Sequence, residues 1–183
     1  MSRSLHAATL PTPVGPLAVV TDDDGVVVVS GFSSVDDSLG RLGPEWADAE
    51  VERDADLGDV ARAVADYAAG DVAALDRVAV AQPGGELLQR MWVELRGVGA
   101  GKTVSYTELA ARADSPTAVR LAGNACARNM VAPFVPCHRV VKADGSVGNY
   151  YYGPDVKKAL LVHEGWAGPD SSDGGASQLA LGD

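Results

Sequence analysis

The chain has 183 residues, a hydrophobic fraction of 46% and a formal net charge of −10. This length fits one average domain or two small ones, and the apolar fraction excludes a disordered chain. No apolar run approaches the ~18 residues of a membrane-spanning helix, and the first residues lack the apolar segment of a signal peptide. Two cysteines exclude a disulfide framework, so we expect a reduced, cytoplasmic setting.

The acidic excess has an unusual composition of 18 Asp and 7 Glu against 11 Arg and 4 Lys. An Asp-rich, Lys-poor surface is typical of proteins from salt-loving organisms, in which molar salt screens the self-repulsion of the chain. A GC-rich genome produces the same bias. Taken alone, the net charge argues against a nucleic-acid partner, because phosphate binding needs Lys and Arg.

The charge is distributed unevenly along the chain. Residues 1–90 carry a net charge of −10, residues 91–168 carry +3, and residues 169–183 carry −3. The middle segment is therefore electrostatically different from the first half.

The first half predicts a small α/β unit. Residues 17–21 and 26–30 are apolar and β-branched and flank an Asp-Asp-Asp-Gly turn, which predicts a hairpin. We expect residues 33–56 to be irregular, a helix over 57–69 and a short strand over 76–84. Pro83, Gly84 and Gly85 then form a plausible linker, so the predicted domains are 1–84 and 85–168, followed by a disordered acidic tail over 169–183.

The second half predicts mostly helices. An apolar face predicts a helix over 86–96, and a capping box of Ser105 and Glu108 begins another that ends near Arg112. Ser115 and Pro116 predict the start of a third helix that runs to Ala127. The last two helices form a helix-turn-helix pattern, which any helical hairpin in a bundle would share.

Two further elements follow in the second half. An Asp-Gly turn predicts a hairpin over 140–147. Pro154 begins a final helix that Gly165 ends.

The adjacent residues Cys137, His138 and Arg139 are the candidate chemical centre. A thiol becomes a nucleophile when a nearby imidazole, guanidinium or helix N-terminus stabilises its thiolate. A regular strand would point Cys137 and His138 to opposite faces, so their pairing needs a turn or a bridging water. A buried cysteine beside a surface histidine is the alternative for such a pair alone. A zinc site is disfavoured because the cysteines and histidines lack the short paired spacing that zinc ligands show.

The surroundings of Cys137 resemble the methylated-DNA–protein-cysteine methyltransferase family, the O6-alkylguanine DNA alkyltransferases. The resemblance covers roughly residues 86–166. The residues that carry it are Val104–Tyr106, Arg120, Asn129, Pro136–Val140, Gly148–Tyr150, Leu160, Leu161 and His163–Gly165. It implies an α+β fold, with a small N-terminal α/β (RNase H-like) domain and a mostly helical C-terminal domain that holds a winged-helix-like helix-turn-helix.

The resemblance also implies a reaction and its residues. The family transfers the alkyl group of O6-alkylguanine to its own cysteine once, without a cofactor or metal. Cys137 then corresponds to the acceptor, His138 to a base that acts through a water, and Glu164 to the group that orients His138. Asn129 corresponds to the residue that fixes the cysteine loop, and Tyr106 to a donor to the extruded guanine.

Further roles follow from the same resemblance. It implies minor-groove binding of double-stranded DNA by a monomer, base extrusion and an Arg120 finger that fills the vacated space. The other candidate DNA-binding residues are Ala118, Ala122, Gly123 and Arg128, with Ala125 as a further small residue on the same helix. The candidate substrate-pocket residues are Val140, Tyr150, Tyr151, Cys126 and Arg139. In the pocket, the carbonyls of Cys137 and Val140 would accept from the guanine amine, and the Tyr151 amide would donate to O6.

One departure from the family pattern affects the expected substrate. Tyr151 and Tyr152 stand where family members usually have small residues, so we expect methyl adducts to be preferred over benzyl adducts. Three other functions remain open at this point: a lesion-binding protein of the same fold without alkyl transfer, a Cys-His hydrolase, and a helix-turn-helix regulator.

Overall fold

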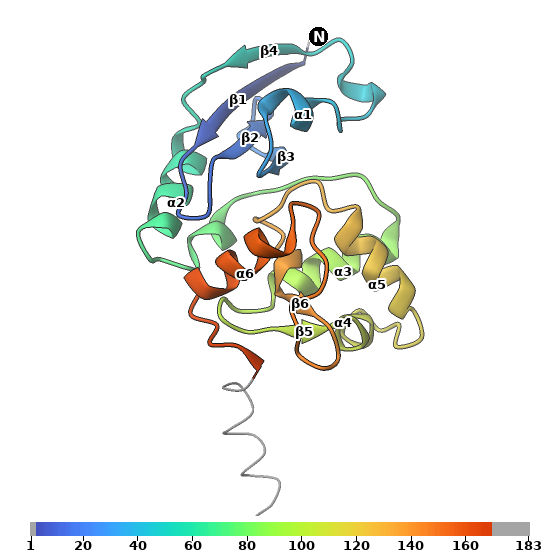
Figure 1. The fold of residues 1–183 in the computed structure, drawn as a ribbon. Helices are drawn as coiled ribbons and strands as arrows, with labels where there is room; N and C mark the ends of the chain where they lie inside the picture. Colours follow the sequence, from blue (N-terminus) through green and yellow to red (C-terminus); the bar gives the residue numbers. More distant parts are fainter. Residues whose placement is uncertain (1–2, 170–183) are drawn as a thin grey trace, which may run out of the picture.

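The computed structural model describes residues 3–169, which form a sheet lobe and a helical lobe (Figure 1). The sheet lobe contains β1 (Ser4–Leu10), β2 (Leu17–Thr21), β3 (Val27–Gly31), α1 (Val35–Leu39), β4 (Glu50–Arg53) and α2 (Gly58–Ala68), with 3-10 turns at Pro44–Trp46 and Ala74–Arg77. The helical lobe contains α3 (Glu86–Arg96), β5 (Val104–Ser105), α4 (Tyr106–Arg112), α5 (Val119–Ala127), β6 (Val140–Val141) and α6 (Pro154–His163), with a 3-10 turn at Cys137–Arg139. No helix within residues 3–169 is long and apolar enough to cross a bilayer.

The sheet has the strand order β3-β2-β1-β4, with β4 parallel to β1 and the other pairs antiparallel. Both faces of its central strands are covered. Val19 and Val27 belong to the cluster that α2 and α3 share, while Val20 and Val29 belong to a second cluster with residues of α1. A strand buried on both faces is apolar throughout, so β2 and β3 are easily recognised in the sequence. The predicted hairpin is confirmed.

Residues 33–56, predicted to be irregular, contain α1 and β4, so that prediction is wrong. Every residue of β4 is exposed, so the strand lacks the apolar alternation that marks a strand in a sequence. Its parallel pairing with β1 defines it instead. The short helix α1 depends on its cap, because the Ser34 hydroxyl accepts a hydrogen bond from the backbone N–H of Asp37. The strand β1 was also not predicted.

The predicted strand over 76–84 is reduced to a single bridge between Val80 and Val27, preceded by a 3-10 turn. The helix over 57–69 is confirmed as α2, and the helix over 86–96 as α3. In the helical lobe, the capping box of Ser105 and Glu108 begins α4 as predicted.

Two boundaries in the helical lobe differ from the prediction. The helix expected from Ser115 begins at Val119, because the Ser115 carbonyl accepts from the Ala118 N–H in a turn. In the predicted hairpin over 140–147 the turn forms, but β6 pairs in parallel with β5 rather than with residue 147. The final helix is confirmed as α6, and Gly165 follows it with a φ of 91°.

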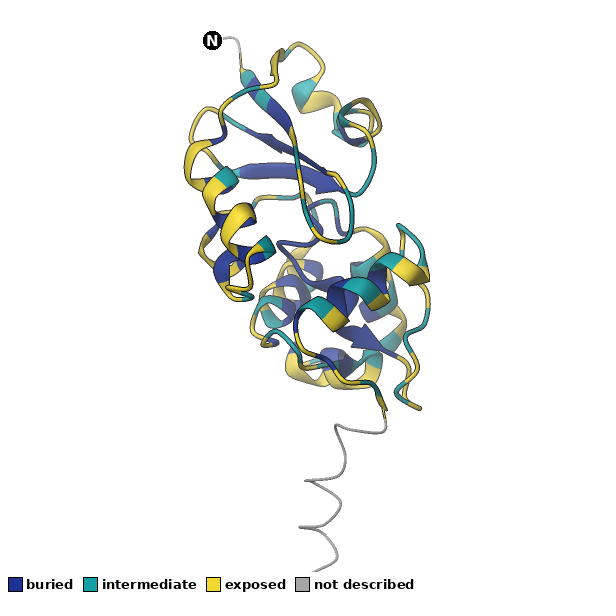
Figure 2. Cartoon of the chain, turned by 60° about the vertical axis from the view of Figure 1, so that its left-hand side comes forward, coloured by how far each residue is buried: buried dark blue, intermediate teal, exposed yellow. Residues whose placement is uncertain are grey.

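The two lobes meet along the edge strand β3. The Ser30 N–H donates to the Met130 carbonyl at 2.8 Å, and the Ser30 hydroxyl donates to the Ala132 carbonyl at 2.8 Å. Buried residues of both lobes, among them Val19 and Leu88, belong to one apolar cluster, and the buried segments of the lobes face each other in Figure 2. The sheet edge thus supports the segment that leads to Cys137. The domain boundary at residue 84 stays a prediction, and most of the predicted acidic tail lies outside the described residues.

Candidate active site

Cys137 begins the 3-10 turn Cys137–Arg139 and is 5% exposed. The Asn129 side-chain amide lies 3.2 Å from its Sγ and also donates to the Val135 carbonyl at 2.7 Å. The Asn129 Oδ1 accepts from the Val131 N–H at 3.1 Å. Both ends of this amide are therefore occupied, and the thiol is held against a fixed donor.

Burial raises the pKa of the Cys137 thiol. The hydrogen bond from Asn129 and the positive charges of Lys157 and Arg41 act in the opposite direction. Desolvation disfavours the thiolate, and these groups partly offset that effect by stabilising its negative charge. Cys137 therefore needs a base nearby to lose its proton.

His138, the residue after Cys137, forms a buried pair with Glu164. The His138 Nε2–H donates to Glu164 Oε1 at 2.8 Å, and both side chains are fully buried. Burial lowers the pKa of His138, which keeps the imidazole neutral near pH 7. In a neutral imidazole whose proton is on Nε2, Nδ1 carries the lone pair. His138 Nδ1 makes no hydrogen bond within residues 3–169, so it is available as a proton acceptor.

Within residues 3–169 the Glu164 carboxylate accepts four hydrogen bonds. Its Oε1 also accepts from Arg139 Nη2 and from the Tyr67 hydroxyl, each at 2.9 Å, and its Oε2 accepts from Arg139 Nε at 2.9 Å. Burial opposes its ionisation, yet His138 and Arg139 together lower its pKa to about 2. A paired carboxylate with this many donors stays ionised.

A cavity of about 400 Å³ opens beside the thiol. It is lined by Tyr106, Gly123, Cys126, Ala127, Cys137, Asn149, Tyr150 and Tyr151. These residues come from α4, α5, the 3-10 turn and the loop that precedes α6. Its volume is of the size that ligand cavities have, so a reacting group can enter from outside and meet Sγ.

The structure groups most of the predicted site residues but moves some of them. Asn129 bonds to Cys137 and His138 bonds to Glu164, two pairs that are joined only through the peptide bond between Cys137 and His138. Tyr106, Gly123, Cys126, Tyr150 and Tyr151 line the cavity. Burial raises the pKa of Cys126, so this thiol stays protonated and acts as a wall.

Two predicted assignments are wrong. Arg139 is 3% exposed and bonds to Glu164 and to the Val98 carbonyl, so it belongs behind the thiol and does not line the cavity. Ala122 is completely buried on the inner face of α5, where DNA cannot reach it, and Ala125 is buried in the same way.

The remaining predicted residues keep accessible or backbone positions. Arg120 and Arg128 are exposed on α5 and at its end, and Ala118 is half-buried at its start. Val140 is buried in β6, which leaves only a backbone role for it in substrate binding. Their contacts with DNA stay predictions.

Four residues at the site were missed by the sequence analysis. Lys157 is 1% exposed and its Nζ donates to the Asn149 carbonyl at 3.1 Å, which fixes the loop that lines the cavity. Arg41, Tyr67 and Gln82 all reach the site from the first half of the chain. Arg41 Nη2 donates to the Asn129 carbonyl at 3.0 Å, and Gln82 Nε2 donates to Asn129 Oδ1 at 3.2 Å. Only the three-dimensional packing brings these residues close, so the sequence held no local signal for them.

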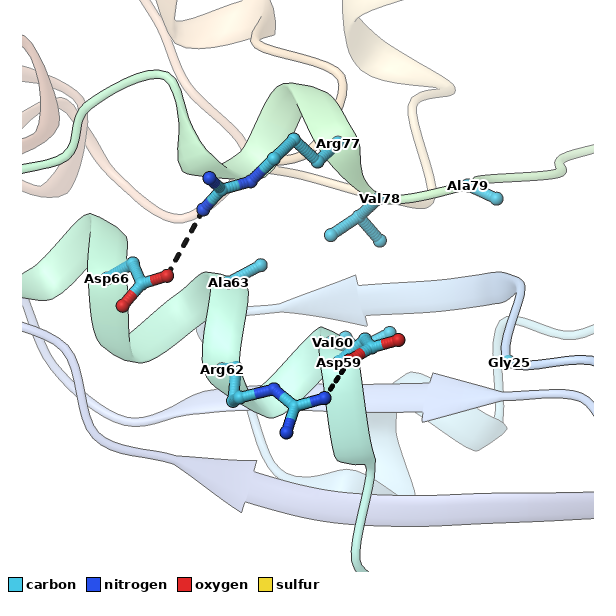
Figure 3. A pocket seen from close by; sticks show the side chains of 9 residues that line it. All are labelled: Gly25, Asp59, Val60, Arg62, Ala63, Asp66, Arg77, Val78 and Ala79. Atoms are coloured by element: carbon cyan, nitrogen blue, oxygen red, sulfur yellow. Dashed lines mark hydrogen bonds and ion pairs between the residues drawn. The ribbon is translucent and has the colours of Figure 1, made fainter.

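A second cavity of about 370 Å³ lies in the sheet lobe beside α2 (Figure 3). Paired charges line it: Asp66 with Arg77 at 3.1 Å, and Asp59 with Arg62. Its described lining includes no thiol or imidazole, so we place the chemistry at Cys137. Within residues 3–169, no three His, Cys, Asp or Glu side chains gather in a way that could hold a metal ion.

Comparison with known proteins agrees with this geometry. Residues 86–166 match the family model described as the DNA-binding domain of 6-O-methylguanine DNA methyltransferase. A methylated-DNA–protein-cysteine methyltransferase of Methanosarcina acetivorans is 32% identical over 161 residues, which are 88% of this chain and 99% of that protein. One from Salmonella typhimurium is 32% identical over 158 residues, covering 85% and 92%.

A solved structure extends the likeness to the fold. The Mycobacterium tuberculosis OGT in complex with DNA has a TM-score of 0.70 and 28% identity, covering 87% of this chain and 92% of that one. Together with the buried thiol network, these likenesses define a DNA-binding repair enzyme of the methyltransferase class. The chain belongs to the methylated-DNA–protein-cysteine methyltransferase family.

Proposed function

We propose that this protein repairs O6-alkylguanine in duplex DNA by direct reversal, and that Cys137 accepts the alkyl group irreversibly in a single turnover. One observation carries the proposal. The Cys137 thiol lies at the wall of an accessible cavity, fixed by Asn129, beside a neutral His138 that Glu164 orients. This is the arrangement of a nucleophile, a base and an orienting carboxylate.

The chemistry follows from these positions. His138 Nδ1 takes the thiol proton through a bridging water, and Glu164 stabilises the imidazolium that forms. The Cys137 thiolate then attacks the alkyl carbon, so that the S–C bond forms while the C–O6 bond breaks and its electron pair stays on the guanine. Hydrogen bonds from the Tyr106 hydroxyl and the Tyr151 N–H neutralise the charge that develops on O6. The thioether has no route back to a thiol, which limits the protein to one turnover.

The target atom must first leave the base stack, because O6 is inaccessible to in-line attack inside paired DNA. Arg120, exposed on α5, fills the space that the extruded guanine leaves. We propose that α5 enters the minor groove, where the small residues Ala118 and Gly123 allow a close approach. Arg128 at the end of the same helix contacts phosphate. One copy of the chain suffices for this binding, and we propose that it acts as a monomer in the cytoplasm.

The size of the cavity sets the expected adduct. Tyr151 forms part of its wall, and the ring of Tyr152 lies 4.8 Å from that of Tyr151 between centroids. Both rings belong to the loop before α6, where their bulk would limit the room for a large adduct. We therefore propose that methyl adducts react faster than benzyl adducts, while the backbone contact at Tyr151 does not depend on its side chain.

Mass spectrometry of the reacted protein tests the proposal. The wild type is incubated with duplex DNA that carries O6-methylguanine, and intact and peptide masses are measured. We expect one added methyl group, on Cys137, and a reaction that stops at one equivalent. Cys137→Ser abolishes the transfer but retains binding to the duplex.

Other outcomes assign other functions. Binding without an adduct indicates a lesion-binding protein, and repeated turnover indicates a hydrolase. Equal binding to methylated and unmethylated duplexes without an adduct indicates a DNA-binding regulator. Each of these three results contradicts the proposal.

A further inference from the structure

The carboxylate that orients His138 is shared with a residue of the other lobe. Tyr67, on α2 in the sheet lobe, is 2% exposed, and its hydroxyl donates to Glu164 Oε1 at 2.9 Å. His138 Nε2 donates to the same oxygen at 2.8 Å. Arg139 Nη2 is the third donor to this oxygen, at 2.9 Å. The three donors thus share one oxygen, although Tyr67 lies 97 residues before Glu164 in the chain and His138 only 26.

We propose that Tyr67 is a positioning residue that sets the proton affinity of His138 by sharing Glu164 Oε1. The inference rests on the proposed function of His138 as the base. The sheet lobe would then influence alkyl transfer, because Tyr67 on α2 weakens the hold of the Glu164 carboxylate on His138.

The charge on the shared oxygen determines how strongly Glu164 holds each donor. Each hydrogen bond that a carboxylate oxygen accepts reduces the attraction that it exerts on the remaining donors. The Tyr67 hydroxyl therefore weakens the stabilisation that Glu164 gives to a protonated His138. The proton returns from His138 more readily, and the neutral imidazole persists to a lower pH.

The Tyr67 hydroxyl is suited to this role because it does not titrate near neutral pH. Burial and the nearby Glu164 carboxylate raise its pKa strongly. It therefore remains a donor across the whole range in which His138 changes its charge. A water molecule at the same place would exchange and reorient, whereas the phenol is fixed by the packing of its ring against His163 at 4.9 Å.

The other charged and titratable groups around the pair come from three elements. Arg139 of the 3-10 turn and Lys157 of α6 both lower the pKa of His138. Tyr150, buried in the loop before α6, is electrostatically close to Cys137, Tyr67 and Glu164. Apart from Tyr67, none of these side chains changes in the experiment below, so a shift that follows the Tyr67 hydroxyl reports the hydroxyl itself.

A purely structural role for Tyr67 predicts something different. Val64 lies one turn before Tyr67 on α2 and is 1% exposed. Shortening its side chain loosens the packing of α2 but leaves the Tyr67 hydroxyl and the contact of its ring with His163 in place. Val64→Ala is therefore the matched control for Tyr67→Phe, which keeps the aromatic ring and loses only the hydroxyl.

The experiment measures the rate of methyl transfer from a methylated duplex between about pH 5 and 9. In Tyr67→Phe we expect the midpoint of the acid limb to move up by about 0.5–1 pH unit, because Glu164 then binds the protonated His138 more tightly. In Val64→Ala the protein melts at a lower temperature and the midpoint stays at the wild-type value. A rate that falls by the same factor at every pH in Tyr67→Phe overturns the inference.

A second variant keeps the inference testable if Tyr67→Phe does not fold. Fluorotyrosine placed at Tyr67 makes the hydroxyl a stronger donor with nearly the same shape, and must move the acid limb down. The pKa of His138, measured by NMR, must rise in Tyr67→Phe and fall in the fluorotyrosine variant. Because this titration needs no DNA, it separates the two hypotheses: a wild type that accepts no methyl group contradicts the proposed function, whereas an unmoved His138 titration contradicts only the role of Tyr67.

Discussion

The two lobes of this protein differ in what their residues do for the site. The helical lobe carries the thiol, its base and most of the cavity wall, while the sheet lobe contributes no reacting atom. The sheet lobe contributes hydrogen bonds instead, through Arg41, Tyr67 and Gln82. Asn129 and Glu164 hold the catalytic groups from within the helical lobe, and the sheet lobe adds a second set of supporting residues from far along the chain.

The two lobes also differ in charge. Residues 1–90 have a net charge of −10 and residues 91–168 have +3, so the net positive charge lies in the lobe that carries the thiol. The acidic excess of the whole chain consequently says little about its ligand. The initial argument against a nucleic-acid partner is wrong, because the charge has to be counted region by region.

The largest expected effect on stability and activity comes from Glu164, which bonds to residues of both lobes. Glu164→Gln removes the charge that compensates the buried Arg139 and that stabilises a protonated His138. We expect a loss of about 3–5 kcal/mol in the free energy of unfolding, the usual cost of breaking a buried ion pair from one side, together with loss of methyl transfer. Urea unfolding and the mass assay measure the two effects.

Glu50→Gln in the exposed strand β4 is the matched control and leaves both quantities near the wild type. The pH dependence gives a further check. Because the pKa of Glu164 falls from 4.5 to about 2 on folding, its contribution to stability is complete above about pH 4.5 and is lost as the pH falls towards 2. Glu164→Gln should therefore unfold with a weaker dependence on acid than the wild type, and an unchanged acid dependence would contradict the network.

An intermediate effect is expected where the sheet lobe holds the aromatic wall. Arg41 Nη1 donates to the Tyr152 hydroxyl at 2.8 Å, and its guanidinium lies 4.6 Å from the centroid of the Tyr151 ring. Gly31 is needed beside them, because a Cβ there would overlap the Tyr152 hydroxyl. Arg41→Ala releases both rings, so we expect about 1–3 kcal/mol lower stability and a higher ratio of benzyl to methyl transfer.

The competing rates with methylated and benzylated guanine in DNA measure this ratio. Arg53→Ala removes the same charge from an exposed pair with Asp36 and should leave the ratio unchanged. If Arg41→Ala and the wild type show equal ratios, the aromatic wall does not depend on the sheet lobe, and the division of labour between the lobes would have to be restricted to Tyr67 and Gln82.

Whether the sequence predicted a feature depended on whether a local pattern marks it. The amphipathic helices α2 and α3, the capping box before α4 and the network residues Asn129, His138 and Glu164 were predicted, because local patterns or a family motif mark them. The strand β4 and the contacts of Arg41 and Tyr67 were not predicted, because pairing partners far along the chain create them. Arg139 was misplaced for a related reason. Its position two residues after Cys137 does not reveal the direction in which the 3-10 turn points the Arg139 side chain.

The smallest expected effect tests whether the sheet lobe has parts that do not serve the site. His6 on β1 lies 2.8 Å from Glu52 of β4 and 3.2 Å from Asp23 in the turn between β2 and β3. Hydrogen bonds to these two carboxylates raise the pKa of His6. Its contribution to stability is therefore complete below the unfolded value of 6.5 and is lost as the pH rises through the higher pKa of the folded protein.

We expect His6→Gln to lower the melting temperature slightly at pH 5.5, and we expect the difference from the wild type to shrink by pH 8.5. The effect is small because all three groups are partly or largely exposed, and exposed ion pairs contribute little. The rate of methyl transfer should not change, because none of the three side chains contacts Arg41, Tyr67 or Gln82 through the described hydrogen bonds. A reduced rate in His6→Gln at full folding would show that the site depends on the whole sheet lobe, and not only on the three side chains that reach it.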